Sequence, residues 1–319
     1  MNSRTKLGIW VIFIIVATVL LAKFSGVSAS KTYRFDFSRG FKLEASDSKL
    51  QEIVNRNLQG VEGNFAVVVE NLAGEERFSL SANEVYPAAS LYKLVLMAAV
   101  LKEIESGGMR TDDTVSASKD HLTDVLGSVD FGYEEVSGDI EYTVEEALTR
   151  MGRISDNFAA IMLTEKLRKS VRGDPLTGMV TELQMKDTNL NPKGDELITT
   201  TASDVTLFFE KLYRGQVVSK TASEKIIDLL ALSKINNRIP AGLPKDTVVI
   251  HKTGELSRIR HDAGIIFLED PGKVSSESAV PKKAYLLVML SKELKYEDEA
   301  VEAMAGISKQ VWEYFSSKN

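Results

Sequence analysis

The sequence feature that most constrains the fold is a helix-length segment that is apolar on every side. Pro87 precedes a segment of about Ser90–Ile104 that ends at Gly107 and Gly108, as expected of one long helix. Residues Leu94–Leu101 within it carry no polar side chain. A helix without a polar face has to be enclosed by other parts of the chain. We therefore expect the rest of a large domain to surround it.

Strand patterns lie on both sides of this segment. Phe65–Leu72 and Arg77–Leu80, separated by a short turn with Gly74, predict a hairpin, and an amphipathic helix is expected before it at Ser46–Leu58. The last third of the chain predicts three more strands and a C-terminal helix with one apolar face. These strands are Thr247–His251, Gly264–Leu268 and Tyr285–Leu290, and the apolar face consists of Met304, Ile307, Val311 and Phe315.

Between these parts the patterns are helical up to about Leu232. Thr143 and Glu146 form a capping box at the start of one helix. Further helices are expected at Phe158–Leu167, Ala202–Tyr213 and Ser223–Leu232. The stretch Asp120–Glu141, rich in glycine, serine and acids, is expected to be a loop. The order of elements predicts an α+β fold, in which an antiparallel β-sheet flanked by helices is joined to an all-helical lobe.

Residues 1–29 are predicted to be an N-terminal signal or membrane anchor. Arg4 and Lys6 precede Leu7–Ala22, which is sixteen residues long and uncharged. A basic start followed by an apolar run is typical of export signals, although a full membrane span needs roughly 20 residues. Both a retained anchor at residues 7–22 and cleavage near Ala29 fit the pattern, and we favour the anchor. Either one exports the rest of the chain, because the basic residues stay on the cytoplasmic side.

The remaining chain is predicted to comprise a juxtamembrane spacer at residues 30–45, with an added edge strand as the alternative, and one catalytic domain at residues 46–319. Residues 1–43 contain seven basic side chains and one acidic side chain, whereas the whole chain of 319 residues has a net charge of −6. The domain is therefore acidic, which argues against a nucleic-acid partner. The absence of cysteine excludes disulfides, a cysteine nucleophile and thiolate metal sites.

Three short motifs carry the candidate chemistry. Ser90 and Lys93 form Ser-x-x-Lys at the start of the apolar helix, residues 155–157 read Ser-Asp-Asn, and residues 252–254 read Lys-Thr-Gly at the end of a predicted strand. Residues i and i+3 share a helix face, so Lys93 should lie beside the Ser90 hydroxyl. A lysine can take a serine proton only if burial, or a second cation such as Lys252, lowers its pKa.

The other two motifs offer groups that could hold a substrate. Ser155 could pass a proton to a leaving nitrogen, and Asn157 could hold a substrate amide. Gly254 allows close approach of a substrate backbone. Lys252 and Thr253 offer a charge and a hydrogen bond to a substrate carboxylate.

Taken together, the order and spacing of these motifs resemble the class A β-lactamase and penicillin-binding serine acyltransferase superfamily, whose signature they are. Tyr142-Thr-Val-Glu-Glu-Ala-Leu before the second motif and Ile239-Pro-Ala-Gly-Leu-Pro244 before the third add to the resemblance, which covers about residues 46–316. It implies a serine hydrolase acylated at Ser90 by a β-lactam or an acyl-peptide, without a cofactor. No histidine-rich spacing suggests a metal.

The resemblance also implies roles for single residues. Lys93 and Ser155 would move protons, and the backbone N–H groups of Ser90 and Glu255 would form the oxyanion hole. Lys252 and Thr253 would bind the substrate carboxylate, together with Arg258 or Arg260.

The match fails at the glutamate that positions the deacylating water in class A enzymes. The family pattern is Glu-x-x-Leu-Asn before a threonine run, which is Thr199–Thr201 here. In one alignment Asp187 replaces the glutamate, with a side chain one methylene shorter. In the other, which we favour, the loop is largely deleted and Asp195 or Glu196 is the nearby acid. Fast deacylation is not expected in either case.

Three functions follow from these observations. The first is a class A-like serine hydrolase acting on β-lactams. The second is a D,D-peptidase-like penicillin-binding protein that turns over slowly. The third is a non-catalytic module that binds the cell wall. The expected partners are a β-lactam or a peptidoglycan stem peptide, and the membrane through the N-terminal segment, and we expect a monomer.

Overall fold

The computed structural model describes residues 31–36, 42–74, 76–126, 138–194, 196–269 and 283–318. The predicted anchor at residues 7–22 and Asp195 lie outside these ranges. No helix within the described ranges is both long and apolar enough to cross a membrane.

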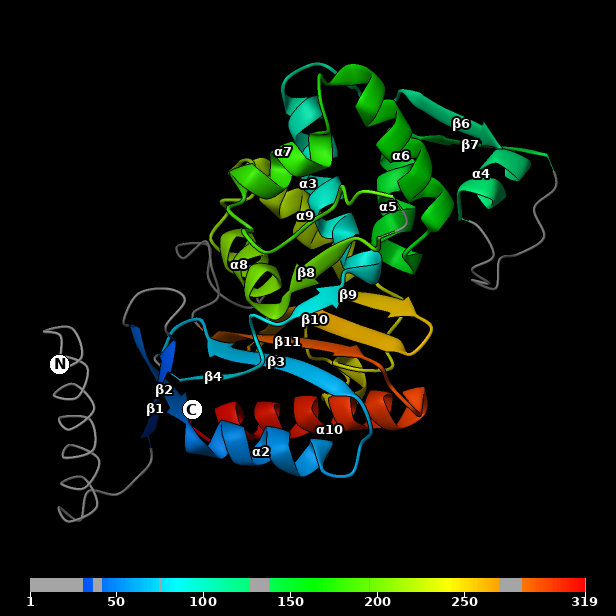
Figure 1. The fold of residues 1–319 in the computed structure, drawn as a ribbon. Coiled ribbons are helices and arrows are strands. Elements are labelled where there is room, and N and C mark those ends of the chain that lie inside the picture. The colour runs from blue at the N-terminus through cyan, green and yellow to red at the C-terminus, as the bar shows by residue number, and fades with distance from the viewer. Residues whose placement is uncertain are drawn as a thin grey trace, which may run out of the picture.

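A five-stranded antiparallel sheet forms one layer of the molecule, in the order β4-β3-β11-β10-β9. Its strands are β3 (Asn64–Asn71), β4 (Arg77–Leu80), β9 (Val249–Leu256), β10 (Ile259–Phe267) and β11 (Ala284–Lys292). Helices α2 (Ser48–Leu58) and α10 (Glu297–Ser316) lie side by side on one face of the sheet (Figure 1).

The alternation of side chains along the strands explains the two faces of this sheet. In β3, Val67 and Val69 pack into the core with α2 and α10, whereas Ala66 and Val68 belong to the larger core on the other side. This period-two pattern is expected of a strand buried on both faces. The predicted apolar face of the C-terminal helix is confirmed, since its four residues are all buried against the sheet.

The second lobe is helical and covers the other face of the sheet (Figure 1). Its helices are α3 (Tyr92–Glu105), α4 (Lys119–Leu126), α5 (Val144–Ile154), α6 (Asn157–Ser170), α7 (Pro175–Glu182), α8 (Ala202–Tyr213) and α9 (Lys220–Ala231). Residues 93–101 of α3 are all buried, with α6, α7 and α9 packed around the helix. The predicted enclosed helix and the α+β architecture are both confirmed.

Short elements connect the two lobes and extend the helical one. They comprise three two-stranded sheets and two 3₁₀ turns: β1 (Lys31–Asp36) with β2 (Lys42–Asp47), β5 (Val85–Pro87) with β8 (Thr199–Thr201), β6 (Thr114–Ser118) with β7 (Asp139–Thr143), η1 (Ala89–Leu91) and η2 (Pro240–Gly242). β1 and β2 pair only with each other, so neither an extended spacer nor an added edge strand describes them in full. Their role as a juxtamembrane spacer stays a prediction.

Two expectations about elements are wrong in part. The stretch from Asp120 to Glu141 is not all loop, because most of α4 and the start of β7 lie within it. Leu122 anchors α4 in the core, and β7 is held by pairing with β6, so tertiary contacts override the polar composition. The Lys-Thr-Gly motif lies inside β9 rather than at a strand end, because β10 pairs with β9 as far as Leu256.

Candidate active site

Ser90 lies in a tight turn that three neighbouring segments hold in place. It is the middle residue of η1 and directly precedes α3. Ala89 before it has a φ of 44°, a left-handed conformation that is costly for a residue with a Cβ. The backbone N–H of Ala88 donates to the carbonyl of Ile198 at 2.8 Å, and β5 pairs with β8. The strained turn is therefore fixed from both sides, as a positioned nucleophile requires.

Lys93 lies at the centre of the site. Its Nζ is 3.2 Å from Ser90 Oγ and 3.3 Å from Ser155 Oγ, and it also donates to Asn157 Oδ1. The side chain is fully buried. Burial and the charge of Lys252 hold the pKa of Lys93 well below its usual range, against the opposing effect of Asp156. The neutral amine is the form that can accept a proton from Ser90.

The Ser-Asp-Asn motif forms the junction between α5 and α6. Ser155 caps α5 in a left-handed conformation with a φ of 57°. Asp156 caps α6 by accepting from the Ala159 N–H at 3.1 Å, and it accepts from Arg150 Nε at 2.7 Å. The capping function of this motif therefore sets the positions of the Ser155 hydroxyl and the Asn157 amide, which both face Lys93.

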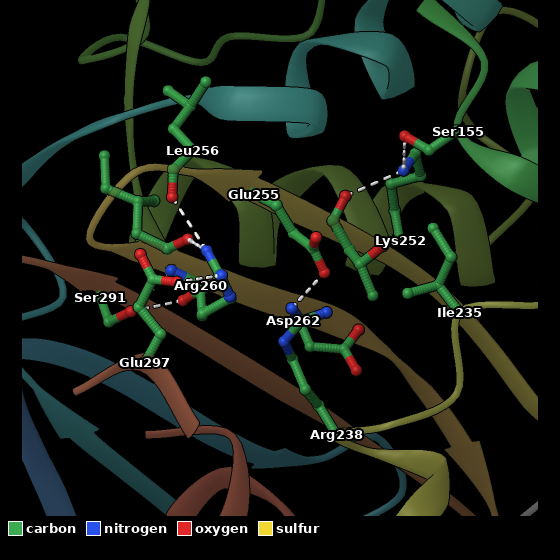
Figure 2. A network of polar contacts seen from close by, with 12 residues as sticks. Ser155, Ile235, Arg238, Lys252, Glu255, Leu256, Arg260, Asp262, Ser291 and Glu297 are labelled. Atoms are coloured by element: carbon green, nitrogen blue, oxygen red, sulfur yellow. Dashed lines mark hydrogen bonds and ion pairs between the residues drawn. The ribbon is translucent and has the colours of Figure 1, made fainter. Parts of the chain in front are cut away.

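Lys252 reaches the same hydroxyl from β9. Its Nζ donates to Ser155 Oγ at 2.7 Å and to the Thr253 carbonyl at 2.8 Å (Figure 2). Burial lowers the pKa of Lys252 to about 7, and Arg238 adds to this effect, whereas Asp262 and Glu255 oppose it. Two buried lysines from different lobes thus converge on one serine hydroxyl, and each lies where the other's charge disfavours its own.

Gly254 brings β9 against the turn that carries Ser90. A Cβ added at Gly254 would lie 3.2 Å from the Ala89 Cβ and 3.1 Å from His261 Cδ2. The buried His261 ring contacts the Pro87 carbonyl through Nε2 at 2.8 Å and accepts from the Ser291 N–H at Nδ1. Burial lowers the pKa of His261 to about 4, so the ring is neutral at pH 7. Glycine and a neutral histidine together allow β9 to approach the turn.

The sequence analysis missed Arg238, and the structure does not support Arg258 or Arg260 at the substrate site. Arg258 donates to the Leu294 carbonyl, and Arg260 donates to the Leu256 carbonyl and pairs with Glu297, so both fasten the β9–β10 turn. Figure 2 shows Arg260 turned towards this end of the strand, away from Lys252.

Arg238, in contrast, is fully buried near Lys252 and pairs with Glu255. Its place directly before the Ile239–Pro244 segment was the one available signal in the sequence.

A buried pair of side chains fixes the segment that carries Arg238. Asp262 Oδ2 accepts from the Ile239 N–H at 2.9 Å, and Asp262 Oδ1 lies 2.8 Å from His251 Nδ1. His251 Nε2 in turn lies 3.2 Å from Asn236 Oδ1. Within the described ranges, no group of three or more histidine and carboxylate side chains is arranged to hold a metal ion.

The candidate deacylating acids are turned away from Ser90 or lie outside the described ranges. Asp187 is exposed, and its backbone N–H donates to Asp204 Oδ2 at 2.8 Å. Glu196 is also exposed, and Asp195 is not described. No hydrogen bond joins Ser90 Oγ to a carboxylate in the part of the chain that the structure describes.

Comparisons with known proteins agree with this geometry. A family model described as the β-lactamase enzyme family matches residues 46–315. The β-lactamase VEB-1 of Pseudomonas aeruginosa is 23% identical over 278 residues, which cover 82% of this chain and 88% of VEB-1. The structure of PBP-A superposes with a TM-score of 0.71 at 21% identity, over 86% of this chain and 98% of PBP-A.

A β-lactamase from Sphaerobacter thermophilus gives a TM-score of 0.69 at 20% identity, over 85% of this chain and 98% of that protein. These structures establish the fold, and the family model establishes the family. The chain therefore belongs to the β-lactamase enzyme family and is a serine hydrolase.

Proposed function

We propose that the chain is a class A-like β-lactam-reactive serine hydrolase in which Ser90 forms an acyl-enzyme with a β-lactam or a related amide. The observation that carries this proposal is the convergence of two buried lysines on Ser90 and Ser155. Three contacts between 2.7 and 3.3 Å link these four side chains. An ordinary helix start with a surface lysine would not bury two cations side by side.

Acylation would begin with proton transfer from Ser90 Oγ to the neutral Nζ of Lys93. The oxygen would attack the substrate carbonyl carbon, and the backbone N–H groups of Ser90 and Glu255 would hold the developing oxyanion. The C–N bond would then break, with Ser155 giving its proton to the leaving nitrogen and recovering one from Lys93. The 2.7 Å contact from Lys252 keeps the Ser155 hydroxyl oriented for this step.

Substrate binding would use the groups that surround this path. Protonated Lys252 and the Thr253 hydroxyl would bind the substrate carboxylate. Asn157, which already accepts from Lys93, would hold the side-chain amide of the substrate.

A second candidate is a penicillin-binding protein that is acylated but deacylates slowly. The exposure of Asp187 and Glu196 supports it, because a deacylating carboxylate must hold a water that faces the acyl carbon. PBP-A, which shares the fold, is described in one solved form as an acyl-enzyme complex with penicillin G. Its likeness to this chain shows the fold alone, so slow turnover has to be measured.

We also propose that the domain acts outside the cytoplasm as a monomer. The basic residues before the uncharged segment 7–22 support export, either with this segment retained as a membrane anchor or after cleavage near Ala29. Cell fractionation of the full chain and of a variant lacking residues 1–29 tests this. Retention of both forms in the cytoplasm would contradict it.

Intact-protein mass spectrometry with benzylpenicillin tests the function. We expect one covalent adduct on the native chain and none on Ser90→Ala, which removes only the attacking oxygen. An adduct that decays within seconds, with hydrolysed penicillin accumulating, identifies a β-lactamase. An adduct that persists for hours identifies the penicillin-binding candidate. Absence of any adduct on the native chain contradicts the proposal.

A further inference from the structure

Arg238 is a buried cation with incomplete partners beside the candidate substrate site. Its side chain is 0% exposed, and its Nη2 pairs with Glu255 Oε1. Its Nε and Nη1 are buried without a hydrogen-bond partner among the described residues. A guanidinium usually binds a carboxylate through two parallel N–H bonds, so this arrangement leaves donor capacity unused.

The partner of Arg238 comes from the strand that carries the third motif. Glu255 directly follows Gly254 on β9, and Figure 2 shows its side chain turned towards the Arg238 guanidinium. The Glu255 side chain is 45% exposed, although the arginine that it pairs with is fully enclosed. The carboxylate therefore lies at the solvent boundary, where an incoming molecule can meet it.

Both charges of this pair act on Lys252. Arg238 lowers the pKa of Lys252, and Glu255 raises it, so each lies within electrostatic reach of the Nζ that contacts Ser155. Without Glu255, two buried cations would face a substrate carboxylate at this end of the site. With Glu255, one of them is already neutralised by a carboxylate of the protein itself.

We propose that Glu255 is a specificity-determining residue whose carboxylate occupies Arg238 in place of a substrate carboxylate. It thereby weakens the preference of the site for a carboxylate over an uncharged ester or amide at the same position of the substrate. The inference rests on the proposed function in one respect, namely that Lys252 and Thr253 face this substrate group. Like charges placed a few ångströms apart repel in a poorly solvated site, which gives the effect its sign.

The test measures equilibrium binding rather than turnover. In the Ser90→Ala background, which cannot be acylated at this position, calorimetry gives the dissociation constants of benzylpenicillin and of its methyl ester. Glu255→Gln keeps the shape and an acceptor for Arg238 but removes the charge. Glu297→Gln is the matched control, because Glu297 pairs with Arg260 at the other end of the same strands (Figure 2).

We expect Glu255→Gln to shift the ratio of the two dissociation constants about tenfold in favour of the acid, and Glu297→Gln to leave it unchanged. Adding Arg238→Gln to Glu255→Gln should reduce the shift, because the freed guanidinium is then missing. If the double variant does not fold, the single variant and its control still decide.

The inference is overturned if Glu255→Gln gives no gain in binding of the acid, or if Glu297→Gln gives the same gain. Acylation of the chain that retains Ser90 is recorded separately. If that chain is never acylated while the binding ratio shifts, the proposed function fails and the role of Glu255 stands. If acylation occurs without a shift in the ratio, the reverse holds.

Discussion

Acylation of Ser90 by a carboxylate-bearing penicillin should slow about 100-fold between pH 7 and pH 9, through the loss of one proton from Lys252. Burial lowers the pKa of this lysine from 10.5 to about 7. This lowering corresponds to about 5 kcal/mol between its charged and neutral forms. Two pH units above its pKa, about 1% of Lys252 keeps the charge that attracts the substrate carboxylate.

The assay is the second-order rate constant of adduct formation with benzylpenicillin from pH 5.5 to 9.5. This constant reports the ionisation of the free enzyme. Lys252→Arg is the matched control, because a guanidinium stays protonated throughout this range and should remove the alkaline fall. The methyl ester of benzylpenicillin should also show a smaller fall. A rate that stays level up to pH 9, or an equal fall in Lys252→Arg, would refute the reasoning.

Three further predictions concern stability and can be measured by urea unfolding. Because Lys252 loses its proton at a lower pH when folded than when unfolded, the native chain should gain up to about 5 kcal/mol from pH 7 to 10.5 relative to Lys252→Met; a constant difference would contradict this. The pKa of His261 is also lower in the folded state, so about 3 kcal/mol of stability present above pH 6.5 should be lost as the pH falls to 4, and His261→Gln should lack this loss. Gly152→Ala should cost about 3 kcal/mol, since its Cβ would lie 2.4 Å from the Leu229 carbonyl oxygen. The control Gly178→Ala meets nothing within 4 Å and should stabilise its helix by about 0.5 to 1 kcal/mol.

The architecture was predictable where local patterns and burial agree. Residues 94–101 are apolar all round, and the structure encloses them. The strand ends were less accessible, because β9 continues through polar residues that are held by pairing with β10. β7 was missed for the same reason, since β6 supplies its hydrogen bonds from more than twenty residues away.

The candidate site shows the same division. Ser90 and Lys93 could be placed together from helical spacing alone, and their 3.2 Å contact agrees with that reasoning. Arg238 could not be placed, because its approach to Lys252 depends on Asp262 holding the adjacent backbone from another strand. A contact set by tertiary hydrogen bonds has no local signature, and a wrong arginine was chosen for proximity in sequence.

The most direct test of the central claim is to locate the penicillin adduct by proteolysis and tandem mass spectrometry. Spacing, burial and the lysine contacts all identify Ser90 as the nucleophile. We predict a single modified peptide whose fragments assign the added penicilloyl group to Ser90, and no modified peptide from Ser90→Ala. Modification of another residue, or an adduct that persists in Ser90→Ala, would contradict the account.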